Sequence, residues 1–312
     1  MLFLSPKSLG NFGKTMPKSA SETPPDLPKL AKRDRFASKR DYGRVAIVGG
    51  ASGMPGAPAL AGMAALRSGT GLVELLVPET VTAITASYDP CLMTYGLPAD
   101  SSGTFSLRAA DALLERLAKA STVAVGPGLG RSEATVALVK TLWHELTQPT
   151  VFDADALWAL AQSDFKTLSH HAGIRILTPH AGEMLRLLGH SSTKQYERNW
   201  LEQKAQDMAE VTRSLIVLKG HSTLITDGAI KKHNETGNPG MATGGTGDVL
   251  TGIIAALLSQ DFPPFDASRL GVWVHGRSGD LASRYLGEIS MTARDLVLYL
   301  PQTFQAVIQS QS

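Results

Sequence analysis

The sequence predicts an α/β fold in which helices cover both faces of a mostly parallel central sheet. Two observations carry this prediction. Short apolar runs rich in β-branched residues recur along the chain, and longer segments with apolar residues at helical spacing follow them. Strands that are apolar along their whole length are typical of parallel sheets buried on both faces. No composition break or repeat divides residues 44–309, so we expect a single domain there.

The expected elements follow one another in a regular order. The strands cover residues 44–48, 72–77, 122–125, 150–152, 174–177 and 215–218, and a hairpin covers residues 224–226 and 230–233. The helices cover residues 54–67, 109–120, 132–146, 156–160, 183–188, 193–213, 249–258, 267–285 and 292–309. Prolines in the segment 54–67 fall only in its opening turn, where a helix tolerates them.

The composition is that of a compact enzyme. The 312 residues are 43% hydrophobic and include 30 glycines, and the net charge is only +2, so nothing indicates a disordered or nucleic-acid-binding protein. No apolar run approaches the roughly 18 residues that a membrane helix needs. The single cysteine, Cys91, leaves no partner for an intrachain disulfide. We therefore expect a cytoplasmic protein.

The N-terminal segment differs from the rest in charge. Residues 1–40 contain nine Lys or Arg and three acidic residues, so they carry +6 and the remainder carries −4. Because the segment has little hydrophobic periodicity, we expect residues 1–40 to be a mobile basic tail and residues 41–312 to form the domain. Contact of the tail with nucleic acid or an import receptor is the alternative. We expect deletion of residues 1–30 to leave activity unchanged.

Glycines are concentrated between Asn238 and Asp248, just before the apolar run of residues 249–258, which predicts a helix. These four glycines are Gly240, Gly244, Gly245 and Gly247. Such density lets successive backbone N–H groups turn toward one point, and a helix N-terminus adds further unpaired N–H groups. This combination predicts a cradle for an anion, most plausibly a phosphate. Asp248 could be a simple helix cap. Its position beside a phosphate site instead indicates a general base, which would accept the proton of a hydroxyl group as that group is phosphorylated.

Five of the expected strands are followed directly by unusual residues. These endings are Gly49-Gly50, Gly126-Pro127-Gly128, Asp153, Thr178-Pro179-His180 and Lys219-Gly220. Taken singly, they are ordinary turns, a helix cap, a structural histidine and a surface lysine. In a parallel sheet, however, the carboxyl ends of the strands meet at one edge, where open α/β folds bind ligands. Together with the cradle, they predict one binding site at that edge.

Several familiar site signatures are absent from the sequence. It has no Gly-x4-Gly-Lys-Ser/Thr loop, no dinucleotide fingerprint that opens a strand–helix unit, and no Gly-x-Ser-x-Gly elbow. The eight histidines show no zinc spacing. We therefore predict no metal site built from protein side chains.

These motifs, taken in order, resemble the NAD(P)H-hydrate dehydratase family of the ribokinase-like superfamily. The matching segments are Val48-Gly-Gly50, Met54-Pro-Gly-Ala57, Gly126 to Gly130, Asp153 to Leu157, Leu177 to Glu183, Val217 to Gly220 and Asn238 to Gly252. The resemblance implies a three-layer α/β/α sandwich with a mostly parallel sheet. It also implies a lyase that uses ADP or ATP with Mg²⁺ to dehydrate the S epimer of hydrated NADH and NADPH, and a homotetramer.

The resemblance also implies a role for individual residues. Ala57, Gly128, His180 and Asp248 would contact the hydrated dinucleotide, and Asp248 would be the catalytic base. Lys219, Gly220, His221, Ser222, Thr223 and Gly247 would bind the adenine nucleotide. Pro58 departs from the family pattern, which has a small residue there, and this affects the expected contact of Ala57.

Two other functions fit the same motifs. A small-molecule kinase of the same superfamily, acting on an alcohol such as hydroxymethylpyrimidine or hydroxyethylthiazole, would share the cradle and Asp248 but would release a phosphorylated product. A nucleotide-sensing module without turnover would gain nothing from Asp248. Because the motifs are of bacterial type and the sequence contains no fused epimerase domain, we expect ADP rather than ATP as the nucleotide.

Overall fold

The computed structural model describes residues 23–163, 165–190 and 196–311. Its strands are β1 (Arg44–Val48), β2 (Leu72–Pro78), β3 (Met93–Leu97), β4 (Thr122–Val125), β5 (Thr150–Phe152), β6 (Arg175–Leu177), β7 (Leu215–Leu218), β8 (Thr223–Thr226) and β9 (Lys231–Asn234). The described residues form one nine-stranded sheet in the order β3-β2-β1-β4-β5-β6-β7-β8-β9. Strands β1 to β7 run parallel, and β8 and β9 complete the sheet in antiparallel pairing.

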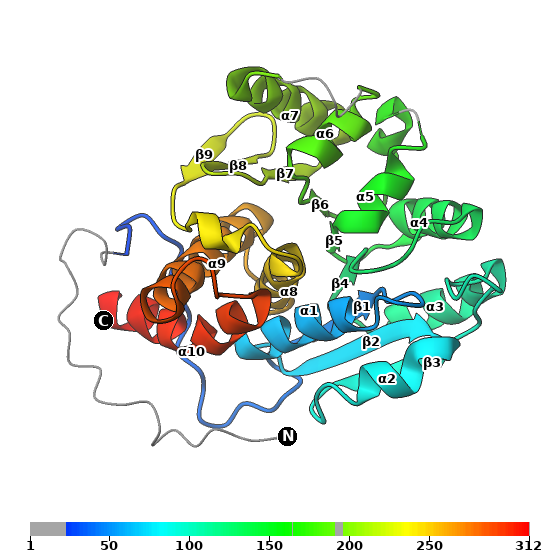
Figure 1. The fold of residues 1–312 in the computed structure, drawn as a ribbon, viewed down its shortest axis with the longest axis horizontal. Helices are drawn as coiled ribbons and strands as arrows, with labels where there is room; N and C mark the ends of the chain where they lie inside the picture. The colour runs from blue at the N-terminus through cyan, green and yellow to red at the C-terminus, as the bar shows by residue number, and fades with distance from the viewer. Residues whose placement is uncertain (1–22, 164, 191–195, 312) are drawn as a thin grey trace.

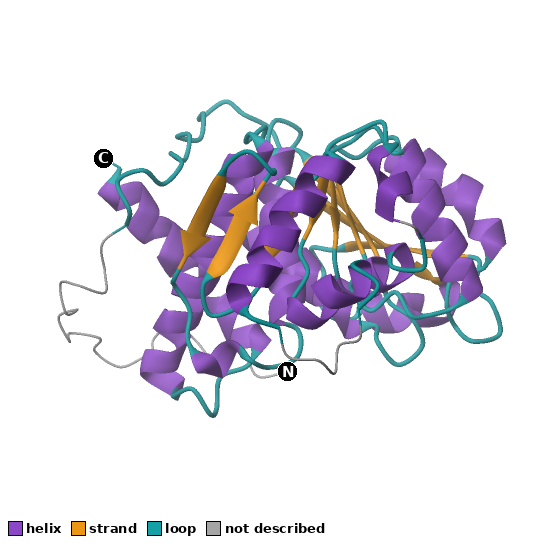
Figure 2. Ribbon diagram, turned by 90° about the horizontal axis from the view of Figure 1, so that it is seen from above, coloured by secondary structure: helices purple, strands orange, loops and turns teal. Residues whose placement is uncertain are grey.

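Helices cover both faces of this sheet (Figure 1). They are α1 (Gly56–Arg67), α2 (Thr82–Ala86), α3 (Ala110–Leu117), α4 (Glu133–Glu145), α5 (Ala154–Leu160), α6 (Ala181–Leu187), α7 (Arg198–Thr212), α8 (Thr246–Ser259), α9 (Pro264–Leu286) and α10 (Ala293–Ser310). Figure 2 shows the strands fanned between the two helical layers. The predicted three-layer α/β/α sandwich is confirmed. None of the described helices has both the length and the apolar character needed to cross a lipid bilayer.

Each face of the sheet has its own core, because successive side chains of a strand point to opposite faces. In β1, Val45 and Ile47 pack with apolar residues of α1, α8, α9 and α10. Ala46 and Val48 of the same strand pack with residues of α3 to α7 on the other face. All four side chains are essentially inaccessible to solvent. This burial on both faces explains why the parallel strands are continuous apolar runs.

Most strand predictions match the structure, and the differences have local causes. The sequence did not predict β3 or α2. β3 is an edge strand in which only Leu97 is buried and Gly96 is exposed, so it lacks the apolar run of the central strands. The expected helix 193–213 is observed as α7 from Arg198, and residues 193–195 lie outside the described part of the chain.

The described part of the N-terminal segment packs against the domain. Leu27 is only 7% exposed and belongs to the core under α8 to α10. The carboxylate of Asp26 accepts hydrogen bonds from Lys232 of β9 at 3.2 Å and from Arg269 of α9 at 2.8 Å. Residues 26–27 are therefore not part of the mobile tail that the sequence predicted. The sequence could not reveal this contact, because one isolated apolar residue forms no periodic pattern. The domain boundary at residue 41 stays a prediction, and residues 1–22 lie outside the described part.

Candidate active site

A cavity of about 880 Å³ opens at the carboxyl edge of the sheet. Its walls are the segments that follow β5, β6, β7 and β9, together with the first turn of α8 and one face of α9. Seven of the predicted site residues line it, namely His180, Lys219, Gly220, His221, Thr223, Gly247 and Asp248. Ala57, Gly128 and Ser222 are not part of its lining. The tertiary structure thus gathers most of the predicted residues at the edge where ligands bind in open α/β sheets.

The glycine cradle forms one side of the cavity. Gly245 adopts φ +92°, a left-handed conformation that a glycine accepts readily. The helix begins at Thr246 instead of the expected position 249, so Asp248 lies within its first turn. The hydroxyl of Thr246 donates to the carbonyls of Met241 and Thr243, both at 3.0 Å, and fixes the loop before the helix. Within the described chain, the N–H groups of residues 244–248 donate no hydrogen bond, so they can bind an anion.

Asp248 combines a carboxylate with an environment that disfavours its charge. Burial is the largest cause that raises its pKa, and the nearby carboxylate of Asp153 raises it further. The ammonium of Lys219 partly offsets both effects, and the pKa of Asp248 lies at about 7. A carboxyl group with a pKa near neutrality can accept and release a proton under cellular conditions.

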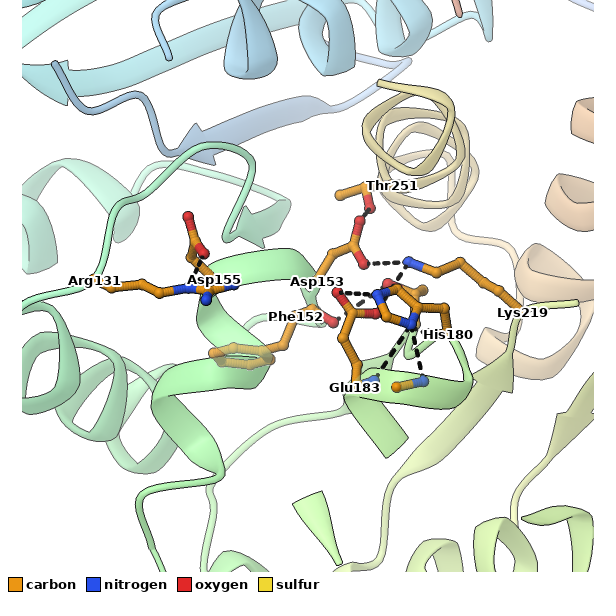
Figure 3. Close-up of polar contacts among 10 residues, drawn as sticks. Arg131, Phe152, Asp153, Asp155, His180, Glu183, Lys219 and Thr251 are labelled. Atoms are coloured by element: carbon orange, nitrogen blue, oxygen red, sulfur yellow. Dashed lines mark hydrogen bonds and ion pairs between the residues drawn. The ribbon is translucent and has the colours of Figure 1, made fainter. Parts of the chain in front are cut away.

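Lys219 follows directly after β7, and an ion pair with Asp153 holds its ammonium group (Figure 3). Its Nζ lies 2.8 Å from Oδ1 of Asp153 and 3.6 Å from Oε2 of Glu183. The hydroxyl of Thr251 donates to the other Asp153 oxygen at 2.8 Å. Burial opposes both charges, but the pairing outweighs it, so the pKa of Lys219 is raised and that of Asp153 is lowered. Lys219 is therefore a charged, paired lysine with only 21% of its side chain exposed, and not the surface lysine of the alternative interpretation.

His180 both caps α6 and lines the cavity. It is the N-cap of α6, and its Nδ1 accepts hydrogen bonds from the N–H groups of Gly182 at 3.0 Å and Glu183 at 3.3 Å. In return, Glu183 accepts the N–H of His180 at 2.8 Å, which completes a capping box. Burial lowers the pKa of His180. The side chain still remains 58% exposed and lines the cavity, and its Nε2 lies 3.5 Å from Oε1 of Glu183.

The two predicted residues on the other side of the sheet centre contact each other. Gly128 has φ +60°, and a Cβ at this position would lie 2.9 Å from the backbone O of Met54 and 3.0 Å from Cβ of Ala57. The two loops are also joined by the N–H of Gly50, which donates to Pro127 O at 2.9 Å. Because α1 packs along α8, the Ala57–Gly128 pair lies on the flank of the cradle helix. The structure brings these two residues together outside the cavity lining.

Sequence reasoning counted Asp153 among the strand ends that form the site but gave neither Asp153 nor Glu183 a role of its own. Asp153 directly follows β5, and Glu183 lies in the first turn of α6, after β6. Their function as partners of Lys219 depends on three loops that meet only in the folded chain. Among the described residues, no group of three or more His, Cys, Asp or Glu side chains could hold a metal ion.

Comparison with known proteins agrees with the geometry. A family model described as NAD(P)H-hydrate dehydratase matches residues 45–302. The bifunctional NAD(P)H-hydrate repair enzyme Nnr of Moorella thermoacetica is 47% identical over 275 residues, which are 88% of this chain and 51% of that protein. The chain thus spans about half the length of this curated relative.

Solved structures show the same fold over most of their length. The ADP/ATP-dependent NAD(P)H-hydrate dehydratase of Bacillus subtilis, co-crystallised with ATP and Mg²⁺, is 28% identical, with a TM-score of 0.75 over 89% of this chain and 95% of that one. A ribokinase-like superfamily protein of Enterococcus faecalis is 27% identical, with a TM-score of 0.76 over 90% and 93% of the two chains. With the family model matched along almost the whole domain, this chain belongs to the NAD(P)H-hydrate dehydratase family.

Proposed function

We propose that this protein restores NADH and NADPH from their hydrated forms. It acts on the S epimer and converts ADP to AMP and phosphate. The observation that carries the proposal is Asp248, a carboxyl group with a pKa of about 7 placed in the first turn of the cradle helix. A base is needed there only if a hydroxyl group is to react beside the bound phosphate.

The nucleotide is proposed to occupy the cavity between the cradle and residues 219–223. Gly247 lies close to the ion pair, since a Cβ on it would be 3.4 Å from Nζ of Lys219. Lys219 and the cradle N–H groups therefore offer positive charge from two sides to a terminal phosphate. Mg²⁺ would enter with the phosphates and supply further positive charge, because the described residues offer no metal cage of their own.

The hydrated dinucleotide is proposed to approach Asp248 from the side of His180, Gly128 and Ala57. The ring hydroxyl attacks the terminal phosphoryl group of ADP, and Asp248 accepts the hydroxyl proton. AMP leaves in this transfer. The C–O bond of the new phosphate ester then breaks, inorganic phosphate leaves with the bonding electrons, and loss of a proton from the neighbouring ring carbon restores the double bond of the dihydronicotinamide ring. Alignment and charge stabilisation supply most of the catalysis in such a transfer.

Three further points rest on the family resemblance. ADP is the proposed nucleotide in preference to ATP, the proposed assembly is a homotetramer, and the proposed location is the cytoplasm. The Bacillus subtilis relative is named as ADP/ATP-dependent, so the nucleotide preference needs a direct comparison.

The test uses the purified chain with Mg²⁺ and separated epimers of hydrated NADH. ADP and ATP are supplied in parallel, and both the absorbance of regenerated NADH and free phosphate are followed. We expect equal amounts of NADH and phosphate from the S epimer, none from the R epimer, and the higher rate with ADP. A stable phosphorylated product would identify a kinase, and nucleotide binding without turnover would identify a sensing module.

A further inference from the structure

A half-buried arginine of α7, Arg198, contacts the backbone of the loop of residues 219–223. Arg198 is the first residue of α7, and its Nη2 donates to the carbonyls of Leu218 at 3.1 Å and Ser222 at 2.6 Å. Its Nη1 donates to the carbonyl of Lys219 at 3.3 Å. One planar group thus binds three carbonyl oxygens at the start and near the end of this loop. Such a fork of N–H donors holds its acceptors in a fixed geometry.

The sequence of the loop is adapted to this contact. A Cβ at Gly220 would lie 2.7 Å from Nη1 of Arg198, a distance at which the guanidinium would have to move. A glycine at this position therefore lets Arg198 lie flat against the loop backbone. Ser222 does not line the cavity, but its carbonyl group accepts a hydrogen bond from Arg198. Its backbone therefore helps to fix the loop.

Arg198 is itself held in position by two further side chains. Its Nε donates to Oε1 of Glu202 at 2.8 Å, one helical turn further along α7. The other oxygen of Glu202 lies 2.9 Å from Nε2 of His233 on β9. Burial works against the charge of Glu202, but the hydrogen bonds from His233 and Arg198 outweigh it and lower its pKa. The carboxylate therefore stays charged and links α7 to the hairpin beside the cavity.

Arg198 binds carbonyl groups of the loop and leaves the loop's N–H groups available for a ligand. In the described chain, the N–H groups of Gly220, His221 and Ser222 donate no hydrogen bond. Gly220 and His221 line the cavity. We propose that Arg198 is a positioning residue that shapes the loop of residues 219–223 for an adenine nucleotide, with Glu202 fixing its orientation. This inference rests on the proposed function only in that the cavity binds such a nucleotide.

The test measures nucleotide binding directly by calorimetry, with ADP and Mg²⁺ and without the dinucleotide substrate. Since three charge-assisted hydrogen bonds are lost, we expect Arg198→Ala to weaken ADP binding by about tenfold or more. Arg198→Lys restores only part of the affinity, because an ammonium lacks the planar fork. Glu202→Gln keeps the side-chain volume and has a smaller effect in the same direction. In turnover assays, KM for ADP rises in each variant while KM for the hydrated dinucleotide changes little.

Lys204→Ala is the matched control on the same helix. Lys204 pairs with Asp207 at 2.9 Å on the surface, so its loss should leave ADP binding unchanged. If wild-type protein fails to bind ADP, the proposed function fails. If wild-type protein binds ADP and the folded Arg198→Lys and Glu202→Gln variants bind it equally well, the role of Arg198 is refuted. An equal rise in both KM values would also overturn it, because that result marks a general loss of structure.

Discussion

The ammonium of Lys219 and the carboxylate of Asp153 lie 2.8 Å apart, directly beside the backbone of Gly247. This pair joins the ends of β5 and β7 to the cradle helix, since Asp153 also accepts the hydroxyl of Thr251. Each member acts on the pKa of Asp248 in the opposite direction, because Asp153 raises it and Lys219 lowers it. The ion pair therefore tunes the proposed base as well as holding the site together.

The first prediction uses this opposition. Asp153→Asn removes a negative charge, so the pKa of Asp248 should fall and the acidic limb of the kcat/KM profile should move to lower pH. Lys219→Gln removes a positive charge, so the limb should move to higher pH. A pH–rate profile for each variant checks both directions. Shifts of the same sign in the two variants would mean that the limb does not report Asp248.

The second prediction concerns Asp248→Asn. Loss of the base should lower kcat by about 10²- to 10⁴-fold while ADP still binds. The wild-type carboxyl group has its pKa raised from 3.8 to about 7 on folding, so the folded state loses stability as the pH rises between these values. Asn carries no charge, and the variant should be the more stable protein at about pH 8. Urea unfolding measures this difference, which should vanish in acid. Near-native turnover would reject the base assignment.

The third prediction separates the two roles of His180. His180→Ala removes the N-cap acceptor of α6, which should cost about 1 kcal/mol of folding stability. It should also raise KM for the hydrated dinucleotide more than it lowers kcat. His180→Asn keeps a cap acceptor, so it should recover stability but not KM. Recovery of both would show that the histidine serves only the helix, and a fall in kcat alone would place it in the chemical step.

The fourth prediction addresses the Gly128–Ala57 contact. Gly128→Ala adds a methyl group 2.9 Å from Cβ of Met54 at φ +60°, and the left-handed backbone alone costs about 1–2 kcal/mol. We expect lower stability and a raised KM for the dinucleotide, with ADP binding retained. Gly189→Ala is the control, because Gly189 has φ +73° but open space around its Cβ position. Equal kinetic effects of the two changes would remove Gly128 from the substrate site.

The fifth prediction concerns the stability of a protein without residues 1–30, a deletion that the sequence predicts to leave activity unchanged. A deletion of residues 1–30 removes Leu27 from the core, which should cost about 1.5–3 kcal/mol. It also removes Asp26, the partner of Lys232 and Arg269. A deletion of residues 1–22 keeps both contacts and serves as the reference protein. Thermal unfolding of the two proteins provides the comparison, and equal midpoints would show that the segment adds nothing.

The sequence by itself determined every strand of the described sheet except β3, the two helical layers and the position of the cradle. Strands such as residues 122–125 and 215–218 were predicted with their observed bounds, because short, continuous apolar runs are typical of strands in a buried parallel sheet. The rule that strand ends meet at one edge then placed His180 and Lys219 together. Both predictions rest on local patterns that need no knowledge of the tertiary contacts.

Only the tertiary structure decided what these residues do to one another. The pKa of Asp248 depends on burial and on charges from β5 and β7, and no spacing along the chain records those distances. The same holds for Arg198, which reaches a loop 20 to 24 positions away in sequence, and for Leu27, whose core site is made by distant helices. Electrostatic coupling and packing act through space, so their partners become known only when the chain is folded.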